Sequence, residues 1–201
     1  MSILLASLFA ISTGLVEPTF VAIGGHDGVE VYLRKDSATI ELAAVGELEA
    51  PPAEVQAALL DYGAHVRINP RLAESRVLAR RDGEQLVYQH LKLPVIADRD
   101  FTLRVSWDQS EPRGLRFAIH NEQGPPATKR AVRMTLLEGR WDLQPIRDGR
   151  ATRAAYHVRI DFAGSVPRWM VRDGAAKDLP NVFIGIRRLI LERRAGAISR
   201  R

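Results

Sequence analysis

The sequence predicts an α+β fold, in which a curved antiparallel β-sheet wraps around a long C-terminal α-helix with an internal cavity between them. Short segments of alternating apolar and polar residues, separated by Gly and Pro turns, run from residue 26 to residue 162, and a long apolar stripe at helical spacing follows. An antiparallel sheet with one solvent-exposed face must pack its apolar face against another element, and this helix can fill that role. The 201 residues, of which 46% are hydrophobic and 26% charged, suffice for one globular domain.

The chain begins with an apolar run at residues 3–16, which is too short to span a membrane as a helix. Small residues near Ala10 and Gly14 fit the cleavage region of a secretory signal, although no Lys or Arg precedes Arg34. We expect residues 1–23 to be a signal peptide or a membrane-tethering segment, and a buried first segment is the alternative. The ligand-binding domain is expected at 24–195, and a basic tail at 196–201.

Two strands and a helix are expected next. A turn at Asp27-Gly28 leads into a strand that ends at Arg34, and residues 38–49 form a second strand. The Pro51-Pro52 pair begins a helix that ends near Tyr62. Residues 67–72 are expected to be a loop or short helix.

Six further strands and the long helix complete the pattern. The clearest strand is the last, where every second residue from Thr152 to Phe162 is apolar, apart from the first, and the residues between are mostly polar. After Gly164-Ser165 a helical pattern continues to about Arg194, and Pro180 should kink or divide it. The six strands are expected at 76–80, 85–93, 100–109, 114–120, 131–144 and 151–162.

Composition excludes some chemistry and suggests a partner. The chain has no cysteine, so disulfides, thiolate metal sites and cysteine nucleophiles are excluded. Residues 1–126 carry 12 Lys and Arg against 17 Asp and Glu, a net charge of −5, whereas residues 127–201 carry 17 against 7, a net charge of +10. The basic C-terminal third indicates an anionic partner, either a membrane surface or a nucleic acid, or else a solvated arginine-rich face.

Five segments of the chain, in sequence order, have a recognisable pattern. They are Asp27-Gly28-Val29 to Arg34, Val45-Gly46-Glu47-Leu48, Leu93-Pro94 with Asp98-Arg99-Asp100-Phe101, Trp141 with Leu143 and Pro145, and Gly164-Ser165-Val166-Pro167 with Trp169-Met170-Val171. Together they resemble the START (steroidogenic acute regulatory protein-related lipid transfer) domain family of the helix-grip superfamily. The resemblance covers about residues 26–194, and the Arg-Asp-Phe element and the Gly-x-x-Pro step before the last helix carry it together.

The resemblance implies a binding module that holds one lipid in a closed cavity and needs no metal or redox cofactor. The last helix and a loop at 120–130 would act as the lid. An acidic–arginine pair of sterol-binding relatives is not matched, because the corresponding positions read Leu86 or Tyr88, and Val105. The expected ligand-binding residues are Arg99, Tyr88, Phe101, Met134, Leu136, Tyr156, Val158, Ile160, Phe162, Met170, Val182, Phe183 and Ile186.

Arg99 and Tyr156 are the leading candidates for polar contacts with the ligand. The resemblance places Arg99 near the cavity, and a guanidinium can donate two parallel hydrogen bonds to a phosphate. The alternative is that Arg99 pairs with Asp98 or Asp100 and fixes the start of its strand. The apolar residues of this set could equally form a plain core.

Membrane contact is expected at the last helix. Trp169 could enter a membrane interface with Arg168 and Arg172 beside it, or it could be a core residue that anchors the helix. Arg187 and Arg188 would add attraction to anionic lipid or form a solvated helix end. The protein is expected to be monomeric, and to be exported or periplasmic with membrane association, or cytoplasmic if the first segment is not a signal.

The sequence carries no recognisable catalytic motif. The five histidines show no metal-ligand spacing, and neither a nucleophile elbow nor a phosphate-binding loop is present. Basic residues without interleaved aromatics also argue against nucleic-acid binding. We therefore expect a non-enzymatic protein that transfers or presents a lipid, and the alternative is an aromatase/cyclase-like enzyme acting on a polyketide or other hydrophobic substrate in the same pocket.

Overall fold

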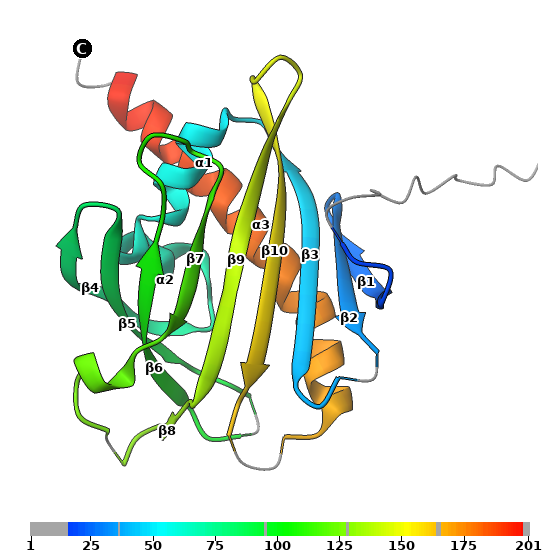
Figure 1. Ribbon diagram of the computed structural model, residues 1–201, viewed down its shortest axis with the longest axis vertical. Helices are drawn as coiled ribbons and strands as arrows, with labels where there is room; N and C mark the ends of the chain where they lie inside the picture. The colour runs from blue at the N-terminus through cyan, green and yellow to red at the C-terminus, as the bar shows by residue number, and fades with distance from the viewer. Residues whose placement is uncertain (1–15, 36, 95, 128, 164–165, 199–201) are drawn as a thin grey trace, which may run out of the picture.

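A computed structural model describes residues 16–35, 37–94, 96–127, 129–163 and 166–198. The chain folds as a large antiparallel sheet with a long helix behind it (Figure 1). The elements are β1 (Phe20–His26), β2 (Val29–Arg34), β3 (Ile40–Leu48), α1 (Pro52–Leu59), η1 (Tyr62–Ala64), α2 (His65–Ile68), β4 (Leu72–Arg81), β5 (Glu84–Leu91), β6 (Arg99–Ser106), β7 (Gly114–Ile119), η2 (Asn121–Gln123), β8 (Val132–Arg133), β9 (Leu136–Ile146), β10 (Ala151–Asp161) and α3 (Arg168–Ile198).

The sheet contains ten strands in the order β1-β2-β3-β10-β9-β7-β6-β5-β4, and the short β8 pairs with β6 in parallel. Every other pairing is antiparallel. β10 lies between β3 and β9, so the last strand joins the N-terminal hairpin to the central strands. The predicted α+β class with a curved antiparallel sheet and a C-terminal helix is confirmed.

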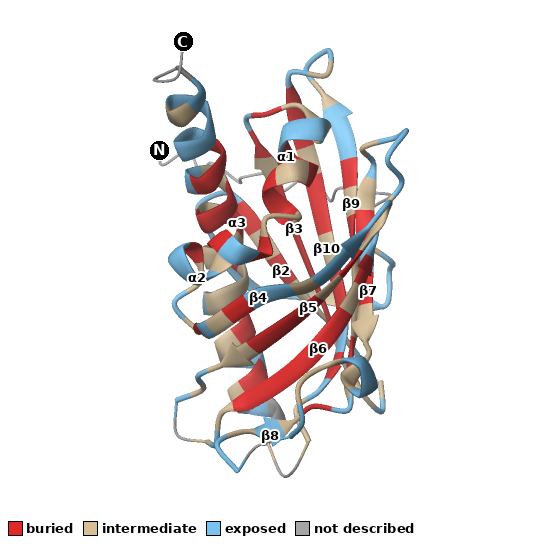
Figure 2. Ribbon diagram, turned by 90° about the vertical axis from the view of Figure 1, so that its left-hand side faces the viewer, coloured by how far each residue is buried: buried red, intermediate tan, exposed pale blue. Residues whose placement is uncertain are grey.

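The sheet turns one face towards α3, which we call the inner face, and the other towards solvent, which we call the outer face. Buried residues form a continuous layer between the inner face and α3 (Figure 2). Phe183 of α3 lies directly over Gly46 of β3, where a Cβ atom would come within 3.0 Å of the phenyl ring. Burial of such a side chain contributes about 1.5–3 kcal/mol. The helix residues buried in this layer are Val171, Ala175, Phe183, Ile186, Leu189 and Ile190.

The first strand was not predicted. β1 begins at Phe20 and pairs with β2 through a hairpin at Asp27-Gly28, whose φ angles of 52° and 73° suit a tight primed turn. Residues 20–23 of the segment expected to be a signal or tether are therefore part of the sheet. The apolar run at 3–16 lies outside the described residues except for its last residue.

Two expected elements differ in continuity. The single strand expected at 131–144 is interrupted at residues 134–135, so that β8 and β9 are separate. The last helix is not divided at Pro180 and continues to Ile198, through the first residues of the expected basic tail; residues 199–201 lie outside the described part. Since α3 also packs on β1, β2, β3, α1 and α2, tertiary contacts support it on both sides of the proline.

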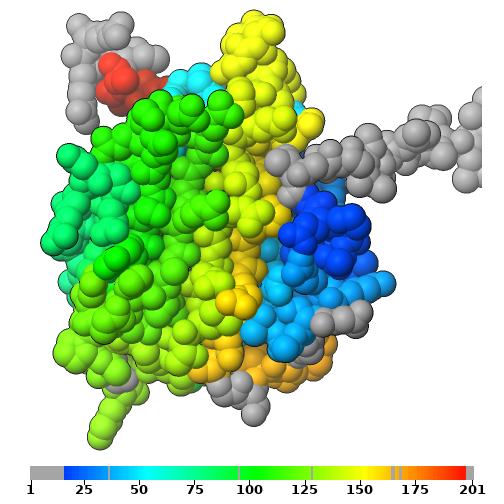
Figure 3. Space-filling model, in the orientation of Figure 1, coloured from blue at the N-terminus to red at the C-terminus, as the bar shows by residue number. Residues whose placement is uncertain are grey.

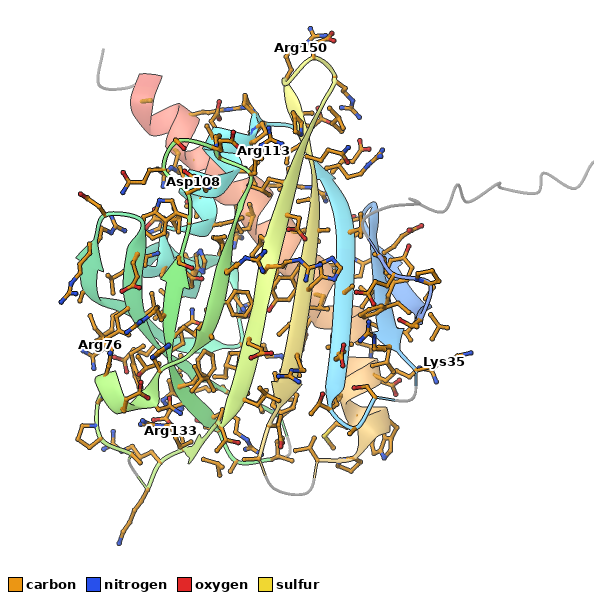
Figure 4. The ribbon with its side chains drawn as sticks, in the orientation of Figure 1. Lys35, Arg76, Asp108, Arg113, Arg133 and Arg150 are labelled. Carbon is orange, nitrogen blue, oxygen red and sulfur yellow. The ribbon has the colours of Figure 1, made fainter. Side chains whose placement is uncertain are left out.

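The loop between β5 and β6, strand β8, and the connection from β10 to α3 lie at one end of the sheet, which we call the lower end (Figure 1). Arg133 of β8 lies at this end, and Arg150 lies at the opposite end (Figure 4). None of the described helices has a stretch long and apolar enough to cross a membrane.

Candidate functional site

The inner face contains apolar side chains that point towards α3 and yet keep accessible surface. Tyr156 of β10 is the most informative of them. Its ring packs at 4.8 Å from the Trp141 ring and at 5.9 Å from the Phe117 ring. Burial raises the pKa of its phenol, as expected for a group deep in the protein, although the side chain is only partly buried. Tyr156 therefore lies on the inner face among aromatic rings and keeps part of its surface accessible.

Other partly buried side chains on the inner side form a discontinuous ring around the same region. They come from β5, β7, the residue after β10 and the middle of α3, so both layers contribute to this partly buried set. They are Leu91, Ile119, Phe162, Leu179 and Val182.

A second phenol, that of Tyr62, lies on the helical side of the core. Tyr62 begins η1, only 7% of it is exposed, and its ring lies 4.6 Å from the ring of His65. Burial, and to a smaller extent the nearby Tyr156 phenol, raise the pKa of Tyr62. The sequence predicted only that a helix ends near Tyr62, and the structure places this tyrosine just after α1, at the start of η1.

Most of the expected ligand-binding residues lie on the inner side. Phe101 and Met134 are fully buried in the core, Val158 and Ile160 follow Tyr156 along β10, and Met170 is half-buried in the first turn of α3. Phe162, Val182, Phe183 and Ile186 join the same cluster. The structure therefore brings eleven of the thirteen expected residues to one side of the sheet, counting Tyr156 and Arg99.

Tyr88 and Leu136 are the two exceptions, because both point to the outer face. Val87 and Gln89 are the inner residues of β5, and the Tyr88 hydroxyl donates to Asp100 Oδ2 at 3.2 Å on the outer side. Leu136 pairs with Asp161, whereas the inner Leu137 pairs with Ile160. The break at 134–135 shifts the alternation by one residue, so Met134 and Leu136 do not share a face as expected.

Arg99 is buried, with 4% exposure, and all its nitrogens are engaged by backbone carbonyls. Nε donates to Phe162 O, Nη1 to Ala97 O and, at 3.3 Å, to Asp98 O, and Nη2 to Ala163 O at 3.1 Å. It therefore fastens the β5–β6 loop to the end of β10. Its partners are carbonyls rather than the carboxylates of Asp98 or Asp100, so the expected ion pair is not formed. These four hydrogen bonds do not exhaust the five N–H groups of a guanidinium, and contact between Arg99 and a ligand stays a prediction.

Asp100 instead binds Arg133, which fixes β8 and the loop before it. Arg133 donates from Nε to Asp100 Oδ1 and from Nη2 to Oδ2, both at 2.8 Å, and also to Pro125 O at 3.1 Å. Asn121, at the start of the same loop, donates from Nδ2 to Met134 O at 2.6 Å. The expected lid loop at 120–130 is thus held by side-chain hydrogen bonds at Asn121, near its start, and at Pro125, in its middle.

The expected membrane-contact residues are not gathered in one place. Trp169 lies in the first turn of α3 and is 64% exposed, so the alternative of a core anchor is wrong. Arg172 is exposed one turn further on, and the side chain of Arg168 lies outside the described residues. Arg187 is about 27 Å further along the helix, at 1.5 Å per residue.

Arg187 and Arg188 hold α3 to the rest of the domain. Arg187 donates to Glu47 O at 2.9 Å and to Asp27 O at 2.9 Å, and Arg188 donates to Arg67 O at 2.7 Å. These contacts attach the helix to β3, to the first hairpin and to α2. The two arginines therefore belong to the packing of the helix.

The outer face has two adjoining hollows, of about 780 Å³ and 480 Å³, and it is the face seen in Figure 3. Both are lined in part by Arg116 and Arg140, which lie directly opposite each other on β7 and β9. Arg140 is paired with Asp142 at 2.7 Å. Among the described residues, no cluster of three His, Asp or Glu side chains could hold a metal ion.

Comparison with known proteins places the chain in a family. The polyketide cyclase / dehydrase and lipid transport family matches residues 48–183, and the chain belongs to it. The STAR-related lipid transfer protein from Xanthomonas axonopodis has a similar fold, with a TM-score of 0.74 and 22% identity over 86% of this chain and 98% of that one. Human STARD10 gives a TM-score of 0.75 and 16% identity over 92% of this chain and 78% of its own. The START resemblance and the helix-grip fold are confirmed.

Aromatase/cyclases are also similar in fold. The Zhui aromatase/cyclase from Streptomyces sp. R1128 gives a TM-score of 0.55 and 15% identity, over 76% of this chain and 92% of that one. The family and fold thus support hydrophobic ligand binding and include both lipid-transfer proteins and enzymes.

Proposed function

We propose that the protein binds one hydrophobic molecule, with a lipid as the leading class, between the inner face and α3, and transfers or presents it at a membrane. The observation that carries this proposal is the accessible surface of Tyr156 and its partly buried neighbours inside an otherwise packed layer. Displacing water from such a surface gives about 25 cal/mol per Å² of apolar area buried. The neighbouring lipid-transfer folds support the same reading.

The lower end is the proposed membrane-facing end. Trp169 is exposed there, and Val132 of β8 is also an exposed apolar residue, at 39%. Lys129, Arg130 and Arg172 are exposed basic residues of the same end. An exposed tryptophan with nearby basic residues suits an anionic membrane interface. We propose that Trp169, Arg172 and the segment that carries Lys129 and Arg130 contact the membrane. We also propose that the protein acts as a monomer.

Native mass spectrometry of protein purified from its own host tests ligand binding. One lipid per chain, identified after extraction, is the expected result. An assay of lipid transfer from donor to acceptor vesicles tests delivery of the ligand to a membrane. Comparing vesicles with and without anionic lipid tests whether the basic residues of the lower end contribute to membrane contact. A protein that arrives empty and neither takes up nor transfers lipid would contradict the proposal.

A cyclase-like activity is the second candidate, because phenols next to a hydrophobic space can orient and protonate a substrate. Incubation with polyketide substrates and detection of a cyclised product tests this candidate. Export is a further proposal, based on residues 1–23. N-terminal sequencing of the protein from its host shows whether this segment is removed.

A further inference from the structure

The smaller hollow of the outer face, of about 480 Å³, has no part in the proposed function. Its volume is in the range of binding sites for small molecules. The charged residues that line it are five arginines and three glutamates, namely Arg34, Arg104, Arg116, Arg140, Arg159, Glu17, Glu41 and Glu138. With histidine counted as neutral, the lining has a net charge of +2, so it attracts anions.

The strand register sets two of these arginines side by side. Arg116 of β7 and Arg140 of β9 are direct partners, and Ser106 of β6 is the partner of Arg116 on its other side. Like charges directly opposite each other on neighbouring strands are destabilising. Asp142 Oδ2 accepts from Arg140 Nε at 2.7 Å, whereas Arg116 is exposed and forms no ion pair with any described residue. An anion between the two guanidinium groups would remove the repulsion.

Arg104 of β6 is the third arginine of this cluster. It pairs with Ala118, whose methyl group adds little bulk between Arg104 and Arg116, and diagonal neighbours of this kind are about 7–8 Å apart. Arg104 Nη2 donates to Gln123 Oε1 at 3.2 Å. Nε, however, is buried and has no hydrogen-bond partner in the described part of the chain, since Glu84 Oε2 is 3.6 Å away. Buried donors normally have an acceptor, and a bound anion can supply it.

The three glutamates of the hollow are held by other arginines. Glu138 Oε1 lies 2.7 Å from Arg159 Nη2, and Glu41 Oε2 lies 3.0 Å from Arg34 Nη1. Glu17 also pairs with Arg34. These carboxylates therefore compensate Arg34 and Arg159 rather than the three arginines of β6, β7 and β9.

The hollow also lacks the apolar residues that a membrane contact needs. The large apolar residues that are exposed in the described part of the protein are Val66, Val77, Val132, Trp169 and Leu191, and none of them lines the hollow. Binding to a membrane interface combines basic residues with apolar side chains that enter the lipid. A soluble anion therefore fits the hollow better than a membrane surface does.

We propose that Arg104, Arg116 and Arg140 form a second binding site, for a soluble phosphate monoester, on the outer face. A phosphate dianion balances the net charge of +2, and its three oxygens can accept from several guanidinium nitrogens at once. The Ser106 hydroxyl, beside Arg116 in the same row, is a further donor. This site goes beyond the proposed function and does not depend on it, because the sheet separates the hollow from α3.

Isothermal titration calorimetry of the full chain tests the proposal with phenyl phosphate, benzoate and benzylamine, which share an aromatic ring and differ in charge. We expect saturable binding of one phenyl phosphate per chain, binding of benzoate that is at least about threefold weaker, and no binding of benzylamine. The affinity for phenyl phosphate should fall between about 20 mM and about 150 mM sodium chloride. Arg104→Gln and Arg116→Gln should each weaken it by about tenfold or more, the effect of one hydrogen bond to a charged group.

Arg113→Gln is the matched control, because Arg113 is exposed and lines the larger hollow but not the smaller one. It should change the affinity for phenyl phosphate by less than about twofold, since solvent and salt screen a charge at this distance. Thermal unfolding of each variant verifies that it is folded. If the wild type showed no saturable binding, or if the wild type and the Arg104 and Arg116 variants bound phenyl phosphate equally, the proposal would be wrong.

Vesicles distinguish a soluble phosphate from a lipid head group. Arg116→Gln should cosediment with anionic vesicles as the wild type does, and a loss of cosedimentation would assign the hollow to a membrane surface and overturn the proposal. Lipid uptake is measured separately by native mass spectrometry, so failure of this proposal is distinguishable from failure of the proposed function.

Discussion

Replacing Arg99 by methionine separates a structural role of this arginine from a ligand-binding role. Its three nitrogens donate four hydrogen bonds to carbonyls of two loops, and the side chain is 4% exposed. A hydrogen bond to a charged group contributes about 1.5–3 kcal/mol. Water can reach some of these carbonyls after the substitution, since Ala97 is exposed and Asp98 and Ala163 are half-buried. We therefore count about two bonds and expect a loss of about 3–6 kcal/mol in the free energy of unfolding.

Urea unfolding measures this loss. With a slope of about 3 kcal/mol per M, the midpoint should fall by about 1–2 M. Arg116→Met is the matched control, because Arg116 is exposed on the outer face and forms no ion pair with any described residue. Its free energy of unfolding should change by no more than about 0.5 kcal/mol. The folded fraction of the Arg99 variant should keep the wild-type preference among lipid head groups. A stable variant that loses binding only to phosphate-bearing lipids would refute this reasoning.

Three further predictions concern other parts of the molecule. Because Trp169 is exposed, Trp169→Ala should change the free energy of unfolding by less than about 0.5 kcal/mol and reduce cosedimentation with anionic vesicles. If the variant and the wild type cosediment equally, Trp169 is not part of the membrane contact. Burial lowers the pKa of His65, so near and below its ordinary pKa of about 6.5 the unfolded chain binds more protons than the folded one. The free energy of unfolding should therefore fall as the pH drops from 7 to 5, by at most about 1.4 kcal/mol per pH unit. Urea unfolding at pH 7 and at pH 5 measures this difference, which should be smaller in His65→Phe. Gly185→Ala should lower the free energy of unfolding by about 1–3 kcal/mol, because the new Cβ would lie 2.6 Å from Ile68 O and 2.8 Å from Ile68 Cβ. Gly196→Ala is the control; its Cβ would meet no atom within 4 Å, and the change should raise the free energy of unfolding by up to about 1 kcal/mol. Equal shifts of the thermal midpoint in the two variants would contradict the close packing of α2 on α3.

Alternation and helical spacing were enough to predict the class of fold, because long amphipathic segments such as β10 and α3 show their period directly. β1 was missed because a short apolar run before a turn can equally end a signal segment. The Asp27-Gly28 turn was a usable signal, since a tight turn of this kind usually has a strand on each side.

The site was harder to predict than the fold, because the facing of a side chain depends on register. The interruption at 134–135 places Leu136 on the outer face, whereas an unbroken strand would have put it on the same face as Met134. The alternation of apolar and polar residues does not reveal such an interruption. Arg99 could be identified as important, but its partners are carbonyls that come together only in the folded chain.

The path of strands ends at β1 and at β4, so the sheet has two outermost strands with unpaired backbone groups on one side. Such a strand can recruit a strand of another molecule. In β4 the register shifts twice, between Leu72 and Glu74 and between Val77 and Ala79, and exposed Arg76, Arg80 and Arg81 carry positive charge along it. Two molecules that met through this strand would bring bulged backbones and like charges together. The register shifts and the exposed arginines of β4 therefore disfavour edge-to-edge pairing with a second molecule, and a neutral, regular β4 would be a better template for it.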